Sequence, residues 1–470
     1  MRHYRVMERR IVVVGGGAAG LMAALRAADA AGGGVLVLEA AREAGRKILV
    51  SGGGRCNVLP GEDAPARFVS ESPGRLVNRF LARWPLEEQR AYFETLLGAP
   101  LVLEAESKKF FPASNRARDV RDALRDAAVK AGAEIRAGAP VREITRTADA
   151  FSIRLDDGDL CARSVVLATG GRSVLAGGAD AAGFEWAAAL GHTIRPTYPA
   201  LAPLVGNAPA HHALSGLSLR ARVAARSGEG RGAESVVSEG GFLFTHRGWS
   251  GPAVLDVSHV VERAARAGRS ADVRVTFLPP ERARDGERGR EREKEREKER
   301  RRDASNGPVQ AAHTVRFGSA DAAAKAWDEL LLAGRRSGGL LSSLLSRSLL
   351  PDRLVQLILA TSGVTDVPLY RLTREARRCV VDALTAFPIP ATGTEGYRTA
   401  EVTGGGVALE EVDPGSGRSR IVPGLFLAGE ILDAFGPIGG FNFQWAWATG
   451  RTAGEGAARS AAARSVSPLR

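Results

Sequence analysis

Apolar runs near the start of the chain outline a strand, a turn, a helix and a second strand. Residues 11–14 form a β-branched run that leads directly into the glycine-rich residues 15–20, and residues 21–31 have helical composition. A second apolar run, 35–38, ends on Glu39. A strand, a glycine turn, a helix and a strand that ends on an acid form the pattern of a dinucleotide-binding βαβ unit.

Each glycine of this turn has a separate task in such a unit. Gly15 allows the sharp turn, Gly17 leaves room for a pyrophosphate against the backbone, and Gly20 lets the helix lie close to its strand. The helix start, with Ala18 and Ala19, offers unpaired amide groups and the positive end of its dipole to the phosphates.

Glu39 follows the last glycine at about the 20-residue spacing at which an acid binds a ribose hydroxyl, and Ala40 next to it is included in the predicted site. The basic residues before the apolar run permit a second interpretation, a secretory signal. Three consecutive glycines in the run and the acid at the expected distance favour the dinucleotide site.

Further along, the periodicity changes. Residues 165–167 have the pattern of a buried strand that runs into Thr169 and Gly170, and this strand returns the chain to the first sheet. Short alternating segments at 218–225 and 236–244 predict a β-rich region. Helical apolar spacing then recurs at 327–332, 340–350 and 353–360, which predicts a small helical module.

Length and composition indicate a globular protein of two or three domains. The chain has 470 residues, of which 44% are hydrophobic, 6% aromatic and 25% charged, and no run of 18 apolar residues suggests a membrane span. Its three cysteines lie far apart without metal-ligand spacing, so we expect a cytoplasmic protein with no metal site. The net charge of +12 comes from arginine scattered along the chain, which favours solubility over a polyanion site.

A glycine-rich basic stretch, residues 45–57 with the sequence GRKILVSGGGRCN, is expected to be a loop around an anion. The stretch resembles the signature of a flavoprotein family that includes aminoacetone oxidases and bile-acid-type enone reductases, within the two-dinucleotide-binding-domain group. The resemblance implies FAD as cofactor, bound along its length by Arg46, Lys47 and the 51–57 loop with Ser51, Gly53 and Asn57. It also implies that the backbone of Val141 contacts the adenine.

A second stretch near the end of the chain resembles the same family. Residues 424–430 read as a buried strand ending in Gly429 and Glu430, followed by GPIGGFNFQWAW at 436–447. Glu430 is expected beside the ribityl chain. Bare amides at Gly439 and Gly440 begin a helix predicted from about Phe441 to residue 456, with Asn442 in its first turn, and a helix start stabilises the negative charge of a reduced flavin by roughly 0.3–2 kcal/mol.

The predicted fold is α/β, with a discontinuous FAD-binding Rossmann-like domain, an inserted β-rich domain and a small helical module. The expected boundaries are 1–196 and 391–460 for the FAD domain, 197–325 for the β-rich domain with a charged low-complexity insertion at 281–302, 326–390 for the helical module, and 461–470 for a disordered tail.

The resemblance implies an FAD-dependent oxidoreductase that transfers a hydride between a small organic substrate and the flavin. Two reactions stay open, amine oxidation to O2 and enone reduction with transiently bound NAD(P)H. No second GxGxxG is present, which slightly favours amine oxidation. No catalytic residue is assigned; His246 is a candidate proton donor but fits a strand-end histidine better, and Cys56 is interpreted as a packed thiol.

A hypothesis from another class is a nucleic-acid-associated flavoprotein that uses FAD structurally or for base modification. The arginine excess motivates it. The charged insertion does not strengthen it, because acidic and basic side chains alternate there and a passive linker is favoured.

Overall fold

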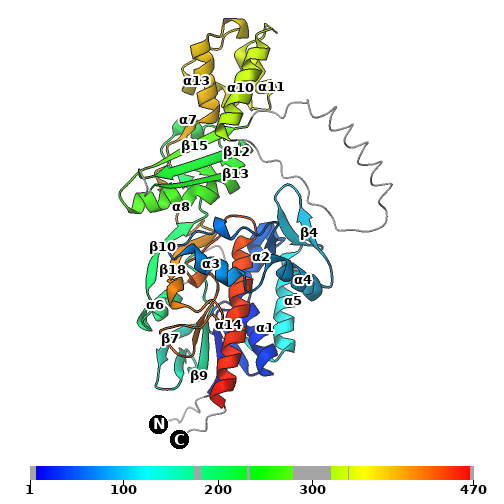
Figure 1. Cartoon of the computed structure of the whole chain (residues 1–470), viewed down its shortest axis with the longest axis vertical. Helices are drawn as coiled ribbons and strands as arrows, with labels where there is room; N and C mark the ends of the chain where they lie inside the picture. Colours follow the sequence, from blue (N-terminus) through cyan, green and yellow to red (C-terminus); the bar gives the residue numbers. More distant parts are fainter. Residues whose placement is uncertain (1–6, 174–180, 230–232, 279–318, 337, 466–470) are drawn as a thin grey trace, which may run out of the picture. The chain divides into compact units, whose positions relative to one another are not determined.

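The computed structural model describes residues 7–173, 181–229, 233–278, 319–336 and 338–465 (Figure 1). Its contacts divide the chain into two units. The first unit comprises Met1–Leu204, Val261–Gly268 and Gly393–Arg470, and the second comprises Val205–Val260 and Arg269–Thr392. The first unit is therefore assembled from both ends of the sequence.

A mainly parallel sheet forms the centre of the first unit, in the order β6-β2-β1-β9 with β19 also paired to β9 and an antiparallel extension through β8 and β7. The strands are β1 (Met7–Val14), β2 (Val35–Glu39), β6 (Ala133–Ala137), β7 (Val141–Arg146), β8 (Phe151–Leu155), β9 (Gly158–Leu167) and β19 (Leu425–Leu427). Val14 is in register with Leu38 and Leu167, and Leu167 with Leu427. The carboxyl ends of four strands consequently lie at one edge of the sheet, where open α/β sheets bind their ligands.

Two helices from opposite ends of the chain, α1 (Ala18–Ala31) and α14 (Phe441–Ser465), run side by side on this sheet (Figure 1). Small residues permit the contact. A Cβ atom on Gly450 would lie 2.5 Å from the carbonyl oxygen of Ala19, and one on Gly454 would lie 2.3 Å from that of Ala23. Neither glycine can carry a side chain unless the helices separate.

The rest of the first unit surrounds this core. Its remaining helices and longer strands are α2 (Arg46–Val50), α3 (Gly74–Leu81), α4 (Leu86–Leu97), α5 (Ala117–Lys130), α6 (Ala182–Ala189), β10 (Ile194–Ala200) and β18 (Val402–Val407), and a small sheet in the order β3-β5-β4 is formed by Leu59–Pro60, Lys109–Pro112 and Leu101–Glu104. Strands β10 and β18 pair with each other in antiparallel orientation.

The second unit contains an antiparallel sheet and a group of helices. The sheet runs β16-β15-β12-β13-β14, formed by Phe387–Ile389, Ala271–Phe277, Ser218–Ser227, Glu234–Phe244 and Gly248–Ser250. The helices are α7 (Pro209–His212), α10 (Ala320–Gly334), α11 (Leu341–Arg347), α12 (Asp352–Ser362) and α13 (Arg374–Thr385), while α8 (Pro252–Arg266) continues into the first unit. The indole of the buried Trp327 on α10 donates to the carbonyl of Phe277 at 2.8 Å and joins helices to sheet.

The predicted α/β fold class is confirmed, with its discontinuous Rossmann-like part, inserted β-rich part and helices. Two local expectations were wrong. Residues 46–50 form helix α2 and 51–54 a 3-10 turn, where a loop was expected. Helix α14 continues to Ser465, so the tail predicted at 461–470 begins inside a helix.

The charged insertion predicted at 281–302 lies outside the described residues. Within the described ranges, no helix combines the length and the apolarity needed to cross a membrane. The same residues bring together no group of three or more His, Cys, Asp or Glu side chains able to hold a metal ion.

The contact between α1 and α14 predicts that Gly454→Ala lowers stability by about 1–3 kcal/mol, because the added methyl group overpacks the helix interface. Gly74→Ala is the matched control, since a Cβ atom at Gly74 meets no atom within 4 Å. Thermal unfolding of the two variants measures the difference, and equal melting temperatures would contradict the close helix contact.

His211 in the second unit is buried among aromatic rings and titrates accordingly. Its ring stacks on Phe387 at 5.0 Å and meets Trp249 edge-on at 5.5 Å. Burial, with a smaller contribution from His212, lowers the pKa of His211 from 6.5 to about 4. The folded protein therefore favours the neutral ring, and the unfolded chain binds the proton more tightly.

Stability should accordingly be full above pH 6.5 and should fall as the pH drops from 6.5 towards 4, by up to about 3 kcal/mol. His211→Phe should remove this part of the pH dependence. Denaturant unfolding of both proteins between pH 4 and 8 tests the prediction; parallel pH profiles would show that His211 does not cause the loss.

Candidate functional site

The glycine turn after β1 lies at the carboxyl edge of the sheet. Gly15 has φ +103°, and a Cβ atom there would lie 2.3 Å from the carbonyl oxygen of Ala168. A Cβ atom on Gly20 would lie 1.8 Å from the carbonyl oxygen of Gly15. Both positions therefore require glycine for the fold itself.

Gly17 differs from its neighbours, because a Cβ atom there would meet no atom within 4 Å. Gly17 is the N-cap of α1, and its helix has no side-chain cap and no acidic residue in its first turn. The first amide groups of α1, which include those of Ala18 and Ala19, thus begin next to open space. A helix start of this kind attracts phosphate.

Glu39 at the end of β2 closes the other side of the turn. One carboxylate oxygen accepts a hydrogen bond from the amide of Gly16 at 2.6 Å, and the other accepts from the amide of Ala41 at 2.8 Å. The amide of Ala139 donates to the carbonyl oxygen of Glu39 at 2.9 Å. Glu39, Ala40 and the segment that leads to Val141 are thereby brought to the same corner of the sheet.

Helix α2 is joined to the glycine turn through its own N-cap. The amide of Gly45 donates to the carbonyl oxygen of Gly16 at 2.8 Å. In the segment just before α2, the carboxylate of Glu43 lies 2.6 Å from the guanidinium of the fully buried Arg121. The same guanidinium donates to the carbonyl of Ala44 at 3.1 Å. The sequence did not indicate Arg121, because its place in α5 has the pattern of an exposed helix face.

Lys47 on α2 meets Glu430, although 383 positions separate them in the chain. The Lys47 ammonium lies 2.5 Å from one carboxylate oxygen of Glu430 and 3.0 Å from the hydroxyl of Ser173. The second carboxylate oxygen of Glu430 accepts from the amide of Thr403 at 2.9 Å. Two predicted cofactor-binding residues thus form one polar cluster, which the amide of Gly429 supports by donating to Thr449 at 2.9 Å.

The loop before α14 is held by the first turn of that helix. The Asn442 side chain accepts from the amide of Gly436 and donates to the carbonyl of the same residue, both at 2.9 Å. Gly439 and Gly440 have φ +131° and +95°, and a Cβ atom on Gly440 would lie 2.5 Å from the carbonyl carbon of Leu59. The Phe441 ring meets Phe68 edge-on at 6.0 Å.

The 51–57 segment turns tightly after α2. The hydroxyl of Ser51 donates to the carbonyl of Ile48 at 2.7 Å, and Gly53 has φ +68° with open space where a Cβ atom would lie. A Cβ atom on Gly52 would lie 3.1 Å from the amide nitrogen of Asn57. Burial raises the pKa of the Cys56 thiol to about 12, so Cys56 is a protonated, packed thiol as expected.

Thr169 and Gly170 follow β9 at the same edge. The Thr169 hydroxyl is buried and has no hydrogen-bond partner among the described residues, while Gly170 has φ +78° and open space beside it. An unpaired buried hydroxyl calls for a ligand. The residues present therefore fit FAD: the uncapped helix start suits its pyrophosphate, and open glycines and a free hydroxyl line the same edge.

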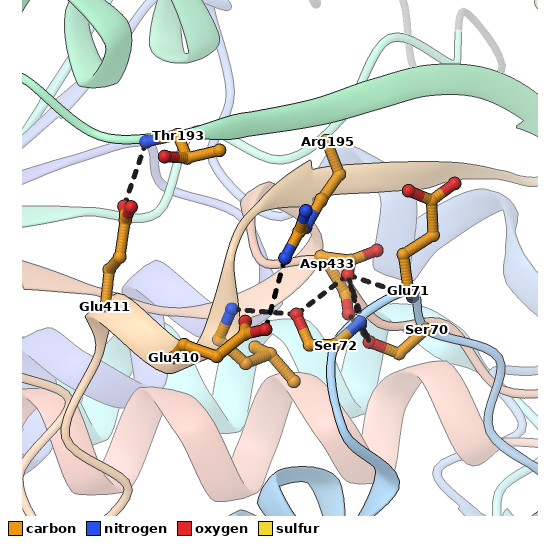
Figure 2. Close-up of polar contacts among 9 residues, drawn as sticks. Ser70, Glu71, Ser72, Thr193, Arg195, Glu410, Glu411 and Asp433 are labelled. Carbon is orange, nitrogen blue, oxygen red and sulfur yellow. Dashed lines mark hydrogen bonds and ion pairs between the residues drawn. The ribbon is translucent and has the colours of Figure 1, made fainter.

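A polar network near α14 was not anticipated (Figure 2). One carboxylate oxygen of the buried Asp433 accepts from the amides of Glu71 and Ser72, at 3.0 and 2.9 Å, and from the hydroxyls of Ser70 and Ser72. Burial raises the pKa of Asp433, whereas these hydrogen bonds act in the opposite direction. The network fastens residues 70–72 to the segment before the 436–440 loop.

Arg195, Glu410 and Glu411 border this network in Figure 2. Arg195 lies 3.1 Å from the carboxylate of Glu410, and the amide of Thr193 donates to Glu411 at 2.9 Å. These contacts attach β10 to the segment after β18.

Two further residues have contrasting positions. Arg172 is half-buried; its amide donates to the Thr403 hydroxyl at 2.7 Å, and its guanidinium has no carboxylate partner within the described part of the chain. His246, the earlier candidate proton donor, is exposed in the turn between β13 and β14 of the second unit. Arg172 is thus a second cationic residue whose backbone is joined to the Thr403 and Glu430 cluster, and sequence reasoning missed it.

Comparison with known proteins agrees with this geometry. A model of the HI0933-like protein Rossmann domain family matches residues 9–456. The 3-dehydro-bile acid delta(4,6)-reductase of Clostridium scindens is 30% identical over 90% of this chain and 92% of its own length. The ribosomal RNA dihydrouridine synthase of Escherichia coli K12 is 28% identical over 88% of this chain and 90% of its own. Among solved structures, 3-ketosteroid-delta4-(5alpha)-dehydrogenase from Rhodococcus jostii RHA1 gives a TM-score of 0.46 at 15% identity, covering 97% of this chain and 98% of that one.

The fold, the glycine turn and the family match define an FAD-dependent oxidoreductase with a Rossmann-type cofactor domain. The chain belongs to the HI0933-like family.

Gly17 gives a direct test of the cofactor site. Gly17→Val should leave the fold intact, because the backbone there has φ −75° and a side chain meets nothing, but should block the pyrophosphate. We expect FAD affinity to fall by at least about tenfold, roughly 1.4 kcal/mol.

Gly74→Val is the matched control, since it also adds a side chain in open space but belongs to α3 and not to the glycine turn. Flavin content per chain and titration of the apoprotein with FAD measure the effect. Unchanged FAD affinity in Gly17→Val, with wild-type melting temperature, would place the cofactor elsewhere.

Proposed function

We propose that this protein reduces a carbon–carbon double bond conjugated to a carbonyl group, with FAD as the resident cofactor and NAD(P)H as the source of electrons. The observation that carries the proposal is the guanidinium of Arg172, which has no carboxylate partner in the described residues, while the backbone amide of Arg172 is joined to the Thr403 and Glu430 cluster. An unpaired guanidinium favours a carbonyl oxygen or an anion and disfavours an ammonium group.

The names of the relatives support this chemistry. One is named for reduction of Δ4,6 double bonds in a 3-dehydro bile acid, and the other for formation of dihydrouridine in ribosomal RNA. A 3-oxo-4,6-diene and a uracil ring both present a C=C bond conjugated to a carbonyl. The shared reaction is a hydride delivered to the carbon β to the carbonyl and a proton delivered to the α carbon.

Residues of this chain would hold the cofactor in the following way. The start of α1 at Gly17 binds the pyrophosphate, Glu39 and Val141 bind the adenosine end, and Lys47 with Glu430 binds the ribityl region. The isoalloxazine supplies the hydride when FAD is bound. Asn442 keeps the 436–440 loop rigid at the start of α14, where the helix dipole stabilises negative charge by roughly 0.3–2 kcal/mol.

Amine oxidation to O2, as in aminoacetone oxidases, is the second reaction that the sequence left open. A carboxylate without a cationic partner would suit a substrate ammonium group, yet Glu430 is paired with Lys47 and one oxygen of the buried Asp433 already accepts four hydrogen bonds. The electrostatics of this edge thus favour reduction of a carbonyl compound over oxidation of an amine.

The substrate is either a free carbonyl compound or a uracil base in RNA. The name of the Escherichia coli relative favours RNA. RNA binding predicts affinity that falls steeply with salt. A dissociation constant at or above roughly 10⁻⁶ M in about 150 mM salt would indicate only nonspecific binding.

An anaerobic experiment tests the proposal. We expect NADPH or NADH to bleach the flavin absorbance of the holoenzyme, and small amines such as aminoacetone not to. The reduced enzyme should then be reoxidised by 2-cyclohexenone, 4-androstene-3,17-dione or a uridine-containing RNA, with the saturated product detected by mass spectrometry. Bleaching by amines only, or reduced enzyme that none of the three compounds reoxidises, would overturn the proposal.

A further inference from the structure

Two buried polar atoms of the first unit have no hydrogen-bond partner among the described residues and lie in the same neighbourhood. They are the Nε atom of Arg172 and the hydroxyl oxygen of Tyr397. The two segments meet where the Ser173 hydroxyl donates to the carbonyl of Glu401 at 3.2 Å, and the turn that carries Tyr397 closes on the same strand start, since the amide of Ala400 donates to the carbonyl of Gly396 at 3.2 Å. A pair of unsatisfied groups, one a cationic donor and the other a phenol, indicates a place for a polar ligand atom.

Arg172 is held at the flavin edge from its backbone and its side chain. Its amide donates to the Thr403 hydroxyl at 2.7 Å, and the amide of Thr403 donates to Glu430 at 2.9 Å. Its guanidinium carbon lies 5.8 Å from the centre of the Phe184 ring. Two hydrogen bonds therefore connect Arg172 to the Glu430 carboxylate, while the guanidinium retains an unused donor.

Tyr397 is presented by a turn that is itself anchored. The amide of Gly396 donates to the Thr394 hydroxyl at 3.3 Å, and that hydroxyl donates to Glu262 at 2.7 Å. Arg266 lies 3.1 Å from Glu262 and donates to the carbonyl of Thr197 at 2.6 Å. The turn is thus fixed by neighbouring side chains, whereas the phenol hydroxyl has no hydrogen-bond partner among the described residues.

Burial keeps the phenol of Tyr397 protonated near neutral pH. Burial raises the pKa of Tyr397, and Glu262 acts in the same direction. The Thr197 side chain, Arg266 and Arg172 lower the pKa by smaller amounts. A neutral phenol beside a cationic guanidinium is suited to give up a proton once negative charge develops on a bound substrate.

We propose that Arg172 binds the carbonyl oxygen of the substrate and that Tyr397 is the proton donor of the reduction. This inference rests on the function proposed above. As the β carbon receives a hydride from the reduced cofactor, negative charge moves to the carbonyl oxygen, where Arg172 stabilises it. The O–H bond of Tyr397 breaks and a C–H bond forms at the α carbon.

The reaction balances without a further reactant. The substrate gains one hydride and one proton. The electron pair of the hydride comes from the flavin, which NAD(P)H has reduced. A proton from the solvent then restores the phenol of Tyr397. Because Arg172 and Tyr397 have different roles, their substitution predicts two different defects. Loss of the phenol slows proton transfer, and loss of the guanidinium weakens ketone binding as well.

The experiment uses the FAD-loaded full chain and follows flavin absorbance, with 2-cyclohexenone as the reacting ketone and cyclohexanone as the saturated ligand. Tyr397→Phe should bleach with NADPH at the wild-type rate, but its reoxidation by 2-cyclohexenone should slow by roughly 10²–10⁴-fold. Its dissociation constant for cyclohexanone, read from perturbation of the oxidised flavin spectrum, should stay within about twofold because binding needs no proton transfer.

Arg172→Gln should weaken cyclohexanone binding by at least about tenfold, the effect of losing roughly 1.4 kcal/mol. Arg172→Lys should recover part of it, because it retains the charge. Tyr370→Phe, a change at an exposed tyrosine of the second unit, is the matched control and should match wild type in every measurement. The flavin content of each variant verifies folding.

A second measurement does not depend on any variant folding. Replacing all five tyrosines with 3-fluorotyrosine lowers their pKa values, so the loss of reoxidation rate at high pH should move to lower pH. Wild-type reoxidation rates in Tyr397→Phe, wild-type cyclohexanone binding in Arg172→Gln, or an unmoved pH profile in the fluorinated enzyme would overturn the assignment while leaving the proposed reduction intact. Failure of wild-type enzyme to reduce 2-cyclohexenone, 4-androstene-3,17-dione and RNA alike would instead remove the proposed function.

Discussion

The pairing of β19 with β9 is the contact on which the rest of the structure depends. Leu425–Leu427 lie parallel to Val165–Leu167, and the amide of Ala428 donates to the carbonyl of Leu167 at 3.0 Å. This short strand inserts the end of the chain beside a sheet begun by its first residues. Parallel strands without a direct connection are slow to form, since a long loop must close before any contact forms. The pairing of β19 with β9 brings Glu430 into contact with Lys47 at the carboxyl edge of the sheet.

The second requirement of the fold is that backbone segments approach each other closely. Glycines from both ends of the chain permit this approach. Gly15 and Gly20 let β1 meet α1, while Gly450 and Gly454 let α1 meet α14. Once these contacts are made, the space next to Gly17 and the unpaired hydroxyl of Thr169 are left at the edge. The close backbone contacts at these glycines thus leave a space at the edge of the sheet in which a cofactor fits.

Much of this architecture could be predicted from the sequence, because glycine turns and apolar runs are local signals. The turn at Gly15–Gly20, the acid at Glu39 and the helix that starts near Phe441 all follow from residues adjacent in the chain. Arg121, Asp433, Arg172 and Tyr397 could not be predicted. Their surroundings come from segments distant in sequence, and no local pattern distinguishes a buried, paired arginine from an exposed one. The short helix α2 was missed because the glycines that follow it obscured five residues of helical composition.

The central claim is that two ends of one chain build a single FAD site, and amide hydrogen exchange with and without one equivalent of FAD tests it most directly. The account predicts that peptides covering residues 15–21 and peptides covering residues 436–443 become protected together, at the same FAD concentration. Protection confined to one of these regions, or to neither, would contradict it.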